Sequence, residues 1–503
     1  MKEFYQSIKI FGKKYISLQR TYILFALILF FVYFFLVNHN PLADSYKYAS
    51  SVKYGVDLFS PHHLLYNAFN YIIYSILSLN SFSIDVMRFM QFVNALFATG
   101  SFYMLYKIIF SRTENKNLSF AGVIFVASSF GVMRFGVEAE TYMIPIFFSL
   151  LSSWFFLQHS KTQKIIYILL SSFFISVACL FHQIHIFWAI GLFIGLLAKK
   201  KYASSALFAL ILLSIPLAYV LVLVFYENQL LTFQNLLRFA ADHYYSENSD
   251  AQLGLQNFLI TPITFIRTFF QIHGVVLTAF KNLFFVYLIV PVVIFFLICG
   301  VRLFFKDFKV RKKNVKNVNF EKTHIIIFVL QLVFAFYAHG NSEFMVMLPF
   351  LMAIFVPIFF RIKIKTVLTI SAAMLLWNIS TGILPNYILD YQNNQQLTKV
   401  IYDNKDMDFI VKEKILVSYQ YFYEYGEKWS PRILEMKDVR EGRTISNSIY
   451  YTDLLSKKTP FSRSDIAQKD NLTDLVFIGH FKHIESDNGG FYIDKVEYTG
   501  KKE

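Results

Sequence analysis

Charged side chains and cysteines are both scarce in this chain. Only 16% of its 503 residues are charged and only 2 are cysteines, whereas an ordinary soluble protein carries about 25% charge. Cys179 and Cys299 both lie inside apolar runs, which excludes a disulfide scaffold and a cysteine-based zinc site. Neither a Walker loop nor a GxGxxG pattern occurs, so the sequence gives no support to a nucleotide site.

Apolar residues dominate what is present. They make up 56% of the chain, with 59 Phe and 32 Tyr. Runs of them approach or reach the length of a membrane crossing, and such runs must be helical because lipid cannot pair a bare strand. There are eleven such runs, at 21–37, 85–110, 118–135, 141–158, 165–181, 183–198, 204–226, 283–305, 324–338, 344–360 and 366–384. We therefore predict an all-α polytopic membrane domain over residues 1–385.

The loop charges predict an orientation. Basic loops alternate with weakly basic or acidic ones, and the positive-inside rule places the basic loops and the N-terminus in the cytoplasm. No small-residue cleavage pattern follows the first run, which indicates a retained helix. The basic stretch 306–322 fits a cytoplasmic loop near anionic lipid better than a nucleic-acid patch. A composition rich in Phe, Ile, Lys and Asn favours a bacterial inner membrane.

A separate unit follows the last run. Residues 386–503 contain 17 basic and 19 acidic side chains, so the excess positive charge of the chain belongs to the membrane domain. With eleven crossings this tail is extracytoplasmic, and its length suits one small domain. We predict an α/β domain with helices at 401–411 and 420–430 and strands at 414–420, 432–439, 474–481 and 490–498.

The carboxylates are unevenly distributed. Residues 1–385 contain fourteen Asp and Glu, none in the middle of a predicted helix. An ion-coupled transporter or proton pump needs ionisable groups near the bilayer midplane, so this distribution favours chemistry at the outer surface. Ten fall on the outer side, namely Asp44, Asp57, Asp85, Glu138, Glu140, Glu227, Asp242, Glu247, Asp250 and Glu343.

Asp44 is the first candidate. It lies in the first outer loop, residues 39–83, a few residues after the first helix. A carboxylate beside the apolar boundary loses water, which raises its pKa and makes it a better base. The structural alternative is an N-cap, with Asp44 preceding an interfacial helix in SYKYASSVKYG.

The segment MRFGVEAETYMIP, residues 133–145, holds the next candidates. Glu138 and Glu140 share a face only if the backbone is extended, since on a helix they diverge by about 200°. We expect Glu140 to begin the following helix, where the helix dipole favours its ionised form. Arg134 either binds a phosphate or pairs with Glu138 in a helix-end salt bridge.

Histidines form the third group. His182 and His185, three residues apart, share a helical face, and His62 and His63 offer two more imidazoles on the same side. Polar packing between helices explains the spacing more simply than a metal site does, because no carboxylates complete a ligand set. We keep His182 as a substrate or phosphate contact and predict no cofactor; a divalent metal lacks a clear ligand set.

The order of these segments resembles the GT-C glycosyltransferases, polytopic enzymes that use lipid-phosphate-linked sugars at the outer or lumenal face. The resemblance is closest to the group related to transmembrane protein O-mannosyltransferases, and it covers roughly residues 20–200. Its motifs are Asp44-Ser45, Tyr54-Gly55-Val56 with Ser60-Pro61-His62-His63, Ala139-Glu140-Thr141-Tyr142, and Phe181-His182-Gln183.

The resemblance implies an inverting transfer of a sugar from a polyprenyl-phosphate donor to a hydroxyl of a protein, lipid or glycan. Asp44 would be the base and Glu140 would orient a hydroxyl, with Glu138 as an alternate. The leaving phosphate needs nearby hydrogen-bond donors. Arg134 is the first choice, because a guanidinium can form two hydrogen bonds to one phosphate group. Further candidate substrate contacts are Lys53, Arg88, His62, His63 and His182.

Two other classes remain open. A flippase or exporter of lipid-linked glycans would need a continuous polar path through the helices, and the absence of mid-helix charge argues against one. A non-catalytic membrane assembly factor would use the tail to dock extracytoplasmic partners, and the carboxylates would then be incidental. Membrane lipid is a partner in every case, and nucleic acid in none.

Overall fold

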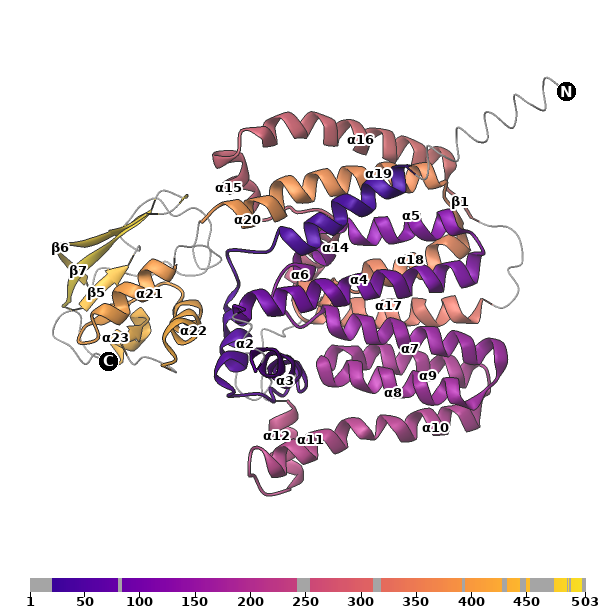
Figure 1. The fold of residues 1–503 in the computed structure, drawn as a ribbon, viewed down its shortest axis with the longest axis horizontal. Helices are drawn as coiled ribbons and strands as arrows, with labels where there is room; N and C mark the ends of the chain where they lie inside the picture. The colour runs from indigo at the N-terminus through magenta and orange to yellow at the C-terminus, as the bar shows by residue number, and fades with distance from the viewer. Residues whose placement is uncertain are drawn as a thin grey trace.

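A body of long helices carries a small α/β unit at one end (Figure 1). The structure is a computed structural model that describes residues 20–79, 84–241, 254–310, 318–390, 394–427, 432–443, 449–452, 475–485, 487 and 490–499. The N-terminal segment before Arg20, the end of the first outer loop at 80–83, the carboxylates Asp242, Glu247 and Asp250, and the centre of the basic stretch at 311–317 lie outside the described residues.

Each of the eleven predicted runs falls on helix, beginning with the helix Arg20–Phe35. Agreement is closest at 165–181, where the observed helix has the predicted bounds. The remaining runs fall on α4 (Val86–Thr113), α5 (Lys116–Ala127), α6 (Phe130–Gly136), α7 (Met143–Thr162), α9 (Ile186–Ala198), α10 (Tyr202–Leu212), α11 (Ser214–Phe225), α16 (Phe285–Asp307), α17 (Asn319–Tyr337), α18 (Leu348–Phe359) and α19 (Ile364–Asn378), and the helix at 165–181 is α8 (Ile165–Phe181).

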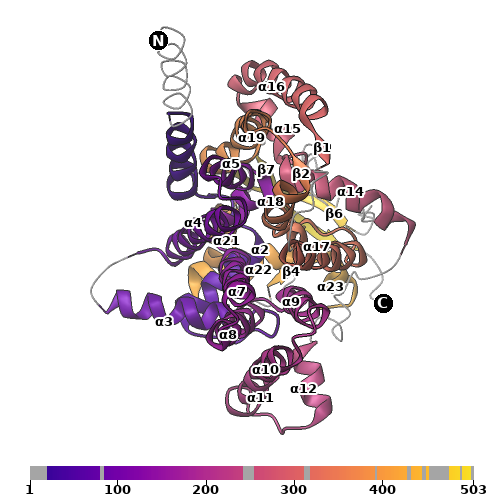
Figure 2. The same ribbon diagram turned by 90° about the vertical axis from the view of Figure 1, so that its right-hand side faces the viewer.

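The helices have the length and hydropathy of a multi-pass membrane protein. Among the described residues, six helices are long and apolar enough to cross a bilayer, and α5 with α6 would add a seventh as one bent span. Three more, Arg20–Phe35, Ile165–Phe181 and Gln183–Ala198, are apolar but shorter. Eleven crossings therefore stays a prediction. In Figure 2 the helices α4, α7, α17 and α18 are seen nearly end-on.

One predicted run is broken in two. Helices α5 and α6 meet at an angle of 71°, across Ser128 and Ser129. Asn378 in α19 satisfies a carbonyl freed by the break, because its side-chain nitrogen donates to Ser128 O at 2.9 Å and to Phe269 O at 2.8 Å. A polar side chain within a helix here completes the backbone pairing that lipid cannot supply.

Several helices lie outside the eleven predicted runs, because their apolar stretches are shorter than a membrane crossing. They are α3 (Tyr66–Ser78), α12 (Phe233–Ala240), α14 (Leu255–Phe269) and α15 (Val275–Asn282). α14 packs against α6 and against the short 3-10 helix η2 (Ser342–Met345), so it borders the segment that carries Glu343.

The first outer loop forms the helix expected in SYKYASSVKYG, α2 (Ala43–Tyr54). At the ends of predicted runs, η1 (Gln183–His185) precedes α9, and the π-helical turn η3 (Ile379–Ile383) and α20 (Leu384–Ile388) continue α19.

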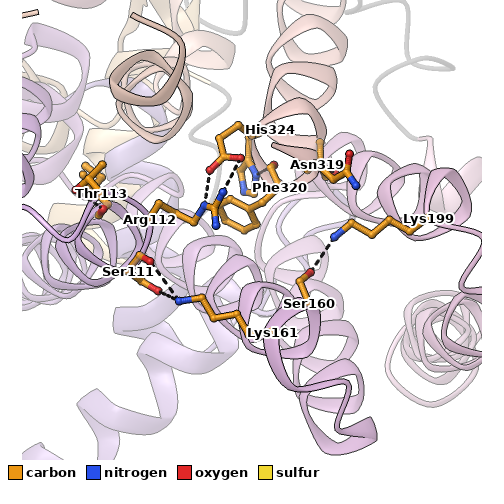
Figure 3. A network of polar contacts seen from close by, with 12 residues as sticks. Ser111, Arg112, Thr113, Ser160, Lys161, Lys199, Asn319, Phe320 and His324 are labelled. Carbon is orange, nitrogen blue, oxygen red and sulfur yellow. Dashed lines mark hydrogen bonds and ion pairs between the residues drawn. The ribbon is translucent and has the colours of Figure 1, made fainter. Parts of the chain in front are cut away.

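Basic side chains form hydrogen bonds and an ion pair between the helix ends that lie away from the tail (Figure 3). The Arg112 guanidinium donates to the buried carboxylate of Glu321, joining α4 to α17. Lys161 Nζ donates to Ser111 Oγ at 2.7 Å, and Lys199 Nζ donates to Ser160 Oγ at 3.0 Å. The basic loops assigned to one side by charge therefore gather on one side of the body. There the two-residue strands β1 (Lys309–Val310) and β2 (Phe360–Arg361) also pair.

The tail is an α/β unit, as predicted, although its elements differ. Its sheet has the order β4-β3-β5-β7-β6, with β3 parallel to β4 and β5 and the other pairs antiparallel. The last two predicted strands are confirmed, whereas 414–420 is helical and 432–439 divides into a short strand and a helix. The elements are α21 (Asn394–Asp403), β3 (Asp408–Ile410), α22 (Lys414–Tyr425), β4 (Ile433–Leu434), α23 (Met436–Arg440), β5 (Ile449–Thr452), β6 (Leu475–Ile484) and β7 (Phe491–Tyr498).

The first half of α22 was mistaken for a strand because both faces of this helix are buried, whereas its second half falls in the helix predicted at 420–430. Val417 and Tyr421 belong to the core of the tail, while Leu416 and Tyr423 pack with α2 of the membrane domain. A helix covered on two sides loses the single apolar stripe that identifies an amphipathic helix. The consequence for the site is direct, because α22 fixes the tail against the helix that begins with Asp44.

Candidate active site

The start of α2 is joined to the segment between α6 and α7. Asn38 Nδ2 donates to Glu138 Oε1 at 3.0 Å, and the backbone nitrogen of Leu42 donates to the same oxygen at 3.2 Å. The Glu138 side chain is 1% exposed. A buried carboxylate that receives two hydrogen bonds from one loop fixes that loop, so Glu138 positions the residues that lead into α2.

Arg134 and Glu138 form the helix-end ion pair that was one of the two sequence interpretations. Arg134 Nε lies 3.6 Å from Glu138 Oε2, and the Arg134 side chain is 18% exposed. Burial raises the pKa of Glu138 above its ordinary value, against the opposing effects of Arg134, Leu42 and Asn38. Part of the Arg134 side chain stays exposed in this pairing, so the pairing does not exclude a phosphate contact by Arg134.

Glu140 lies on the other side of the same turn. Ser45 Oγ in α2 donates to Glu140 Oε1 at 3.3 Å. Burial raises the pKa of Glu140 well above its ordinary value, and the nearby carboxylates of Asp44, Glu138 and Glu343 raise it further. The protonated form of Glu140 is therefore favoured, and in that form its carboxyl group can donate as well as accept a hydrogen bond.

The prediction that Glu140 begins a helix is wrong. Helix α7 starts at Met143, and the backbone of 137–142 is irregular. Asn94 in α4 explains the difference, because its side-chain nitrogen lies 2.6 Å from Glu138 O and 2.6 Å from Glu140 O. These bonds hold the segment in a non-helical turn, which lets the carboxyl groups of Glu138 and Glu140 both reach the start of α2.

Asp44 lies in the first turn of α2 and is exposed. The N-cap of this helix is Leu42, with no side-chain cap, so the alternative in which Asp44 caps the helix is wrong by two positions. Its charge acts on Glu140, on Tyr48 in α2 and on Tyr419 in α22. The structure thus brings together an exposed carboxylate and a buried carboxyl group with a raised pKa at the start of one helix.

Histidines from two separate segments meet beside this pair. The rings of His63 and His182 lie edge to face with centroids 4.4 Å apart, and the His182 ring lies 5.1 Å from that of Tyr142. Ile184 N donates to His182 Nδ1 at 3.3 Å, which assigns the proton to Nε2 in the neutral ring. Burial lowers the pKa of His182 well below its ordinary value, with His63, His185 and His62 adding to the effect.

His182 therefore offers a neutral N–H donor. Its Nε2 is buried and has no hydrogen-bond partner among the described residues. His62 lies farther out, where its Nδ1 pairs with Gln183 Oε1 at 3.0 Å. His185 pairs with Ser149 at 2.7 Å, which is the interhelical packing that sequence analysis favoured for this spacing.

Lys53 and Arg88 do not join the carboxylates. Lys53 Nζ donates to Tyr423 O at 2.7 Å, so it binds the tail at the far end of α2. Arg88, in the first turn of α4, donates to Gln91 Oε1 at 3.2 Å and lines a cavity beneath the tail. The roles of Lys53 and Arg88 as substrate contacts stay predictions.

Sequence reasoning missed several side chains that shape the site. Tyr142 OH donates to Glu343 Oε2 at 3.0 Å, which brings a fourth carboxylate from η2 to the cluster. Glu343 was visible as an outer carboxylate, but nothing in the sequence linked it to Tyr142. Asn38 and Asn94 were equally hidden, because an isolated Asn gives no pattern. Among the described residues, no group of three or more His, Cys, Asp and Glu could hold a metal ion.

Comparison with known proteins identifies only distant structural neighbours. No protein-family model and no curated protein matches the sequence. Two crystal structures of ArnT from Cupriavidus metallidurans are similar in overall arrangement. The apo state shares 9% identity over 96% of this chain and 98% of that one, with a TM-score of 0.42. The structure bound to undecaprenyl phosphate shares 10% identity over 94% and 97%, with a TM-score of 0.44. Likeness at this level assigns neither a family nor an activity to the chain.

Proposed function

We propose that the protein is an inverting glycosyltransferase of the GT-C type, which moves a sugar from a polyprenyl-phosphate carrier to a hydroxyl group at the outer membrane face. One observation carries the proposal, namely the exposed carboxylate of Asp44 beside the buried carboxyl group of Glu140, whose pKa is raised. Two carboxyl groups whose surroundings separate their protonation states are suited to divide the work of a base and a hydrogen-bond donor.

In this mechanism Asp44 is the general base. Its carboxylate takes the proton of the acceptor hydroxyl as that oxygen attacks the anomeric carbon of the donor sugar. A new glycosidic bond forms while the bond between the anomeric carbon and the phosphate oxygen breaks. The polyprenyl phosphate leaves with the electron pair, and attack from the opposite face inverts the anomeric configuration.

Glu140 and Glu138 have supporting roles. The protonated carboxyl group of Glu140 can donate to a sugar or acceptor hydroxyl while its other oxygen accepts from Ser45. Glu138 holds the loop before α2 through Asn38 and Leu42. Asp44 is therefore carried on a fixed helix start, which lowers the cost of positioning the base.

Arg134 and His182 supply the donors that the leaving phosphate requires. Arg134 keeps an exposed portion while paired with Glu138, and a guanidinium can bind two phosphate oxygens at once. His182 presents an unused Nε2–H in a buried setting, where a hydrogen bond to developing negative charge is stronger than in water. The lipid tail of the carrier would lie against the apolar helices.

A transfer assay on the purified protein tests the proposal. Radiolabelled polyprenyl-phosphate hexoses are incubated with wild type or Asp44→Asn, with membrane and periplasmic extracts as acceptor. Transfer of label by wild type alone supports the class and identifies the sugar. If no donor in the panel is consumed while the protein still binds the lipid, transport or scaffolding replaces the proposal.

A further inference from the structure

A cavity of about 400 Å³ lies where the tail meets the helical body. Its inner wall comes from residues 38–41, from Tyr46 in α2 and from the start of α4. The outer wall comes from residues 387–390, from the start of α21 and from the end of α22. The volume is within the range of small-ligand sites, and half of the lining belongs to the tail.

The lining has the chemistry of a site for a polyhydroxylated ligand. Residues with amide side chains line the cavity from both parts. On the inner wall the Asn40 amide nitrogen already donates to Asn386 O and Leu389 O, whereas Gln395 on the outer wall is exposed. Amides donate and accept hydrogen bonds in one plane, which suits vicinal hydroxyl groups. Tyr46, Tyr387 and Tyr423 add aromatic faces, and such faces bury the apolar side of a sugar ring.

The charges of the cavity disfavour anions. Asp85, Asp390 and Glu424 line it together with the Arg88 guanidinium, and the charge of Lys53 also acts on Glu424. Three carboxylates against two cations leave an excess of negative charge, so a phosphate or carboxylate ligand binds less well than a neutral one. This distinguishes the cavity from the region around Arg134, where the leaving phosphate is placed.

The cavity and the carboxylate pair lie on different sides of the start of α2. Asp44 and Tyr46 are two residues apart on this helix, so their side chains diverge by about 200°. Asn38 connects the cavity with the carboxylate site, because it lines the cavity and its side chain donates to Glu138 Oε1. A ligand in the cavity is therefore close to the site without occupying the position of the reacting hydroxyl.

We propose that this cavity is a remote acceptor subsite, which binds a neutral or amine-bearing sugar unit of the acceptor at a distance from the hydroxyl that reacts. The assignment to the acceptor rests on the proposed function, whereas binding of the sugar does not. The tail then has a defined task, which is to supply half of the wall that recognises the acceptor. Energy from such remote contacts helps to hold the reacting hydroxyl in place.

The test uses one blocking variant and one matched control. Gln395 and Gln396 are adjacent exposed residues of α21, and only Gln395 lines the cavity. Gln395→Trp fills the cavity without disturbing the core of the tail, and Gln396→Trp introduces the same side chain beside it. Saturation-transfer NMR on the full-length protein in micelles measures binding of glucose, glucosamine, lactose and glucose 6-phosphate.

The expected result is saturation transfer to the neutral and amine-bearing sugars in wild type, Gln396→Trp and Asp44→Asn, and its loss in Gln395→Trp. Glucose 6-phosphate gives little signal until Glu424→Gln removes one negative charge. Unchanged signals in Gln395→Trp, no signal from any sugar in wild type, or equal binding of glucose 6-phosphate would each overturn the subsite. Because Asp44→Asn still binds, a failure of the proposed chemistry is distinguishable from a failure of the subsite.

If the transfer assay yields an acceptor, a kinetic measurement adds a second arm. Gln395→Trp should raise the KM for that acceptor at least tenfold while kcat stays near the wild-type value, because a remote contact holds substrate and transition state alike. Gln396→Trp should leave both constants unchanged. A fall in kcat without a rise in KM would assign the cavity to the chemical step and contradict a remote subsite.

Discussion

Asn38 and Glu138 are buried hydrogen-bond partners separated by 100 residues in sequence, with Asn38 Nδ2 at 3.0 Å from Glu138 Oε1. Their bond joins the exit of the first helix to the turn between α6 and α7. Asp44 and Glu140 each lie a few residues from one end of this bond. The position of the base relative to the carboxyl group of Glu140 therefore depends on a contact that neither of them makes.

Removal of this contact should destabilise the protein. We expect Asn38→Ala to lower the free energy of unfolding by about 1–3 kcal/mol, because a buried carboxylate oxygen loses a donor. Thermal unfolding in detergent measures the effect. The double variant Asn38→Ala/Glu138→Ala should cost less than the sum of the single variants; strict additivity would show that the pair is not coupled.

Replacement of the base should abolish transfer and leave the fold intact. Asp44 is exposed, so Asp44→Asn removes a charge without opening a cavity. We expect a loss of roughly 10²-fold or more in kcat, the usual contribution of general-base catalysis. Asp57→Asn, an exposed carboxylate of the same loop, serves as control and should retain activity. Wild-type turnover in Asp44→Asn would remove Asp44 from the mechanism.

The pH dependence of transfer should report on Glu140. Its pKa is raised, and a rise in pH through that pKa adds a negative charge beside Asp44 and removes a donor. We expect kcat/KM to fall on the alkaline side in wild type. Glu140→Gln stays neutral at every pH, so this fall should disappear, whereas Glu140→Ala should lose activity throughout. If kcat/KM of Glu140→Gln still falls at alkaline pH, the fall is due to the titration of another group.

The same group should affect stability in the same direction. A carboxyl group whose pKa is higher in the folded state binds its proton more tightly there, so its favourable contribution fades as pH rises above the pKa of an unfolded Glu. Wild type should therefore lose thermal stability with rising pH more steeply than Glu140→Gln. Parallel unfolding curves for the two proteins across neutral and alkaline pH would contradict the raised pKa.

The attachment of the tail depends on a hydroxyl group of α22. Tyr423 OH donates to Asp85 Oδ2 at 2.5 Å. We expect Tyr423→Phe to weaken this junction by about 0.5–1.5 kcal/mol and to speed proteolysis of the tail. Tyr402→Phe is the control, because its ring stacks within the tail on Tyr425 at 4.0 Å. Equal cleavage of wild type and Tyr423→Phe would show that the hydroxyl adds nothing to docking.

Sequence patterns were most informative where one physical rule dominates. Lipid forces apolar runs to be helical, and all eleven predicted runs fall on helix in the structure. That Asp44, Glu138 and Glu140 lie near the edge of the membrane stays a prediction. The pairing of Arg134 with Glu138 also followed from their spacing of four residues. These predictions needed no knowledge of distant contacts.

Predictions failed where a distant partner decides the local structure. Asn94 keeps 137–142 out of helix, which no pattern within that segment reveals. Helix α22 is covered by α2 on one face, so its apolar residues imitate a strand. Glu343 reaches the cluster only through Tyr142. Each error concerns a contact between segments that are far apart in the chain.

The double burial of α22 has a consequence for the order of assembly. Lys53 and Tyr423 are 370 residues apart, and at ordinary rates of synthesis the ribosome needs roughly 20–75 s to cover that interval. During this time α2 lacks its cover, and the cavity beside it has only one wall. The earliest part of the candidate site to be made is thus among the last to be finished. A nascent chain that ends before residue 425 contains the proposed base, Asp44, but only part of the proposed acceptor subsite.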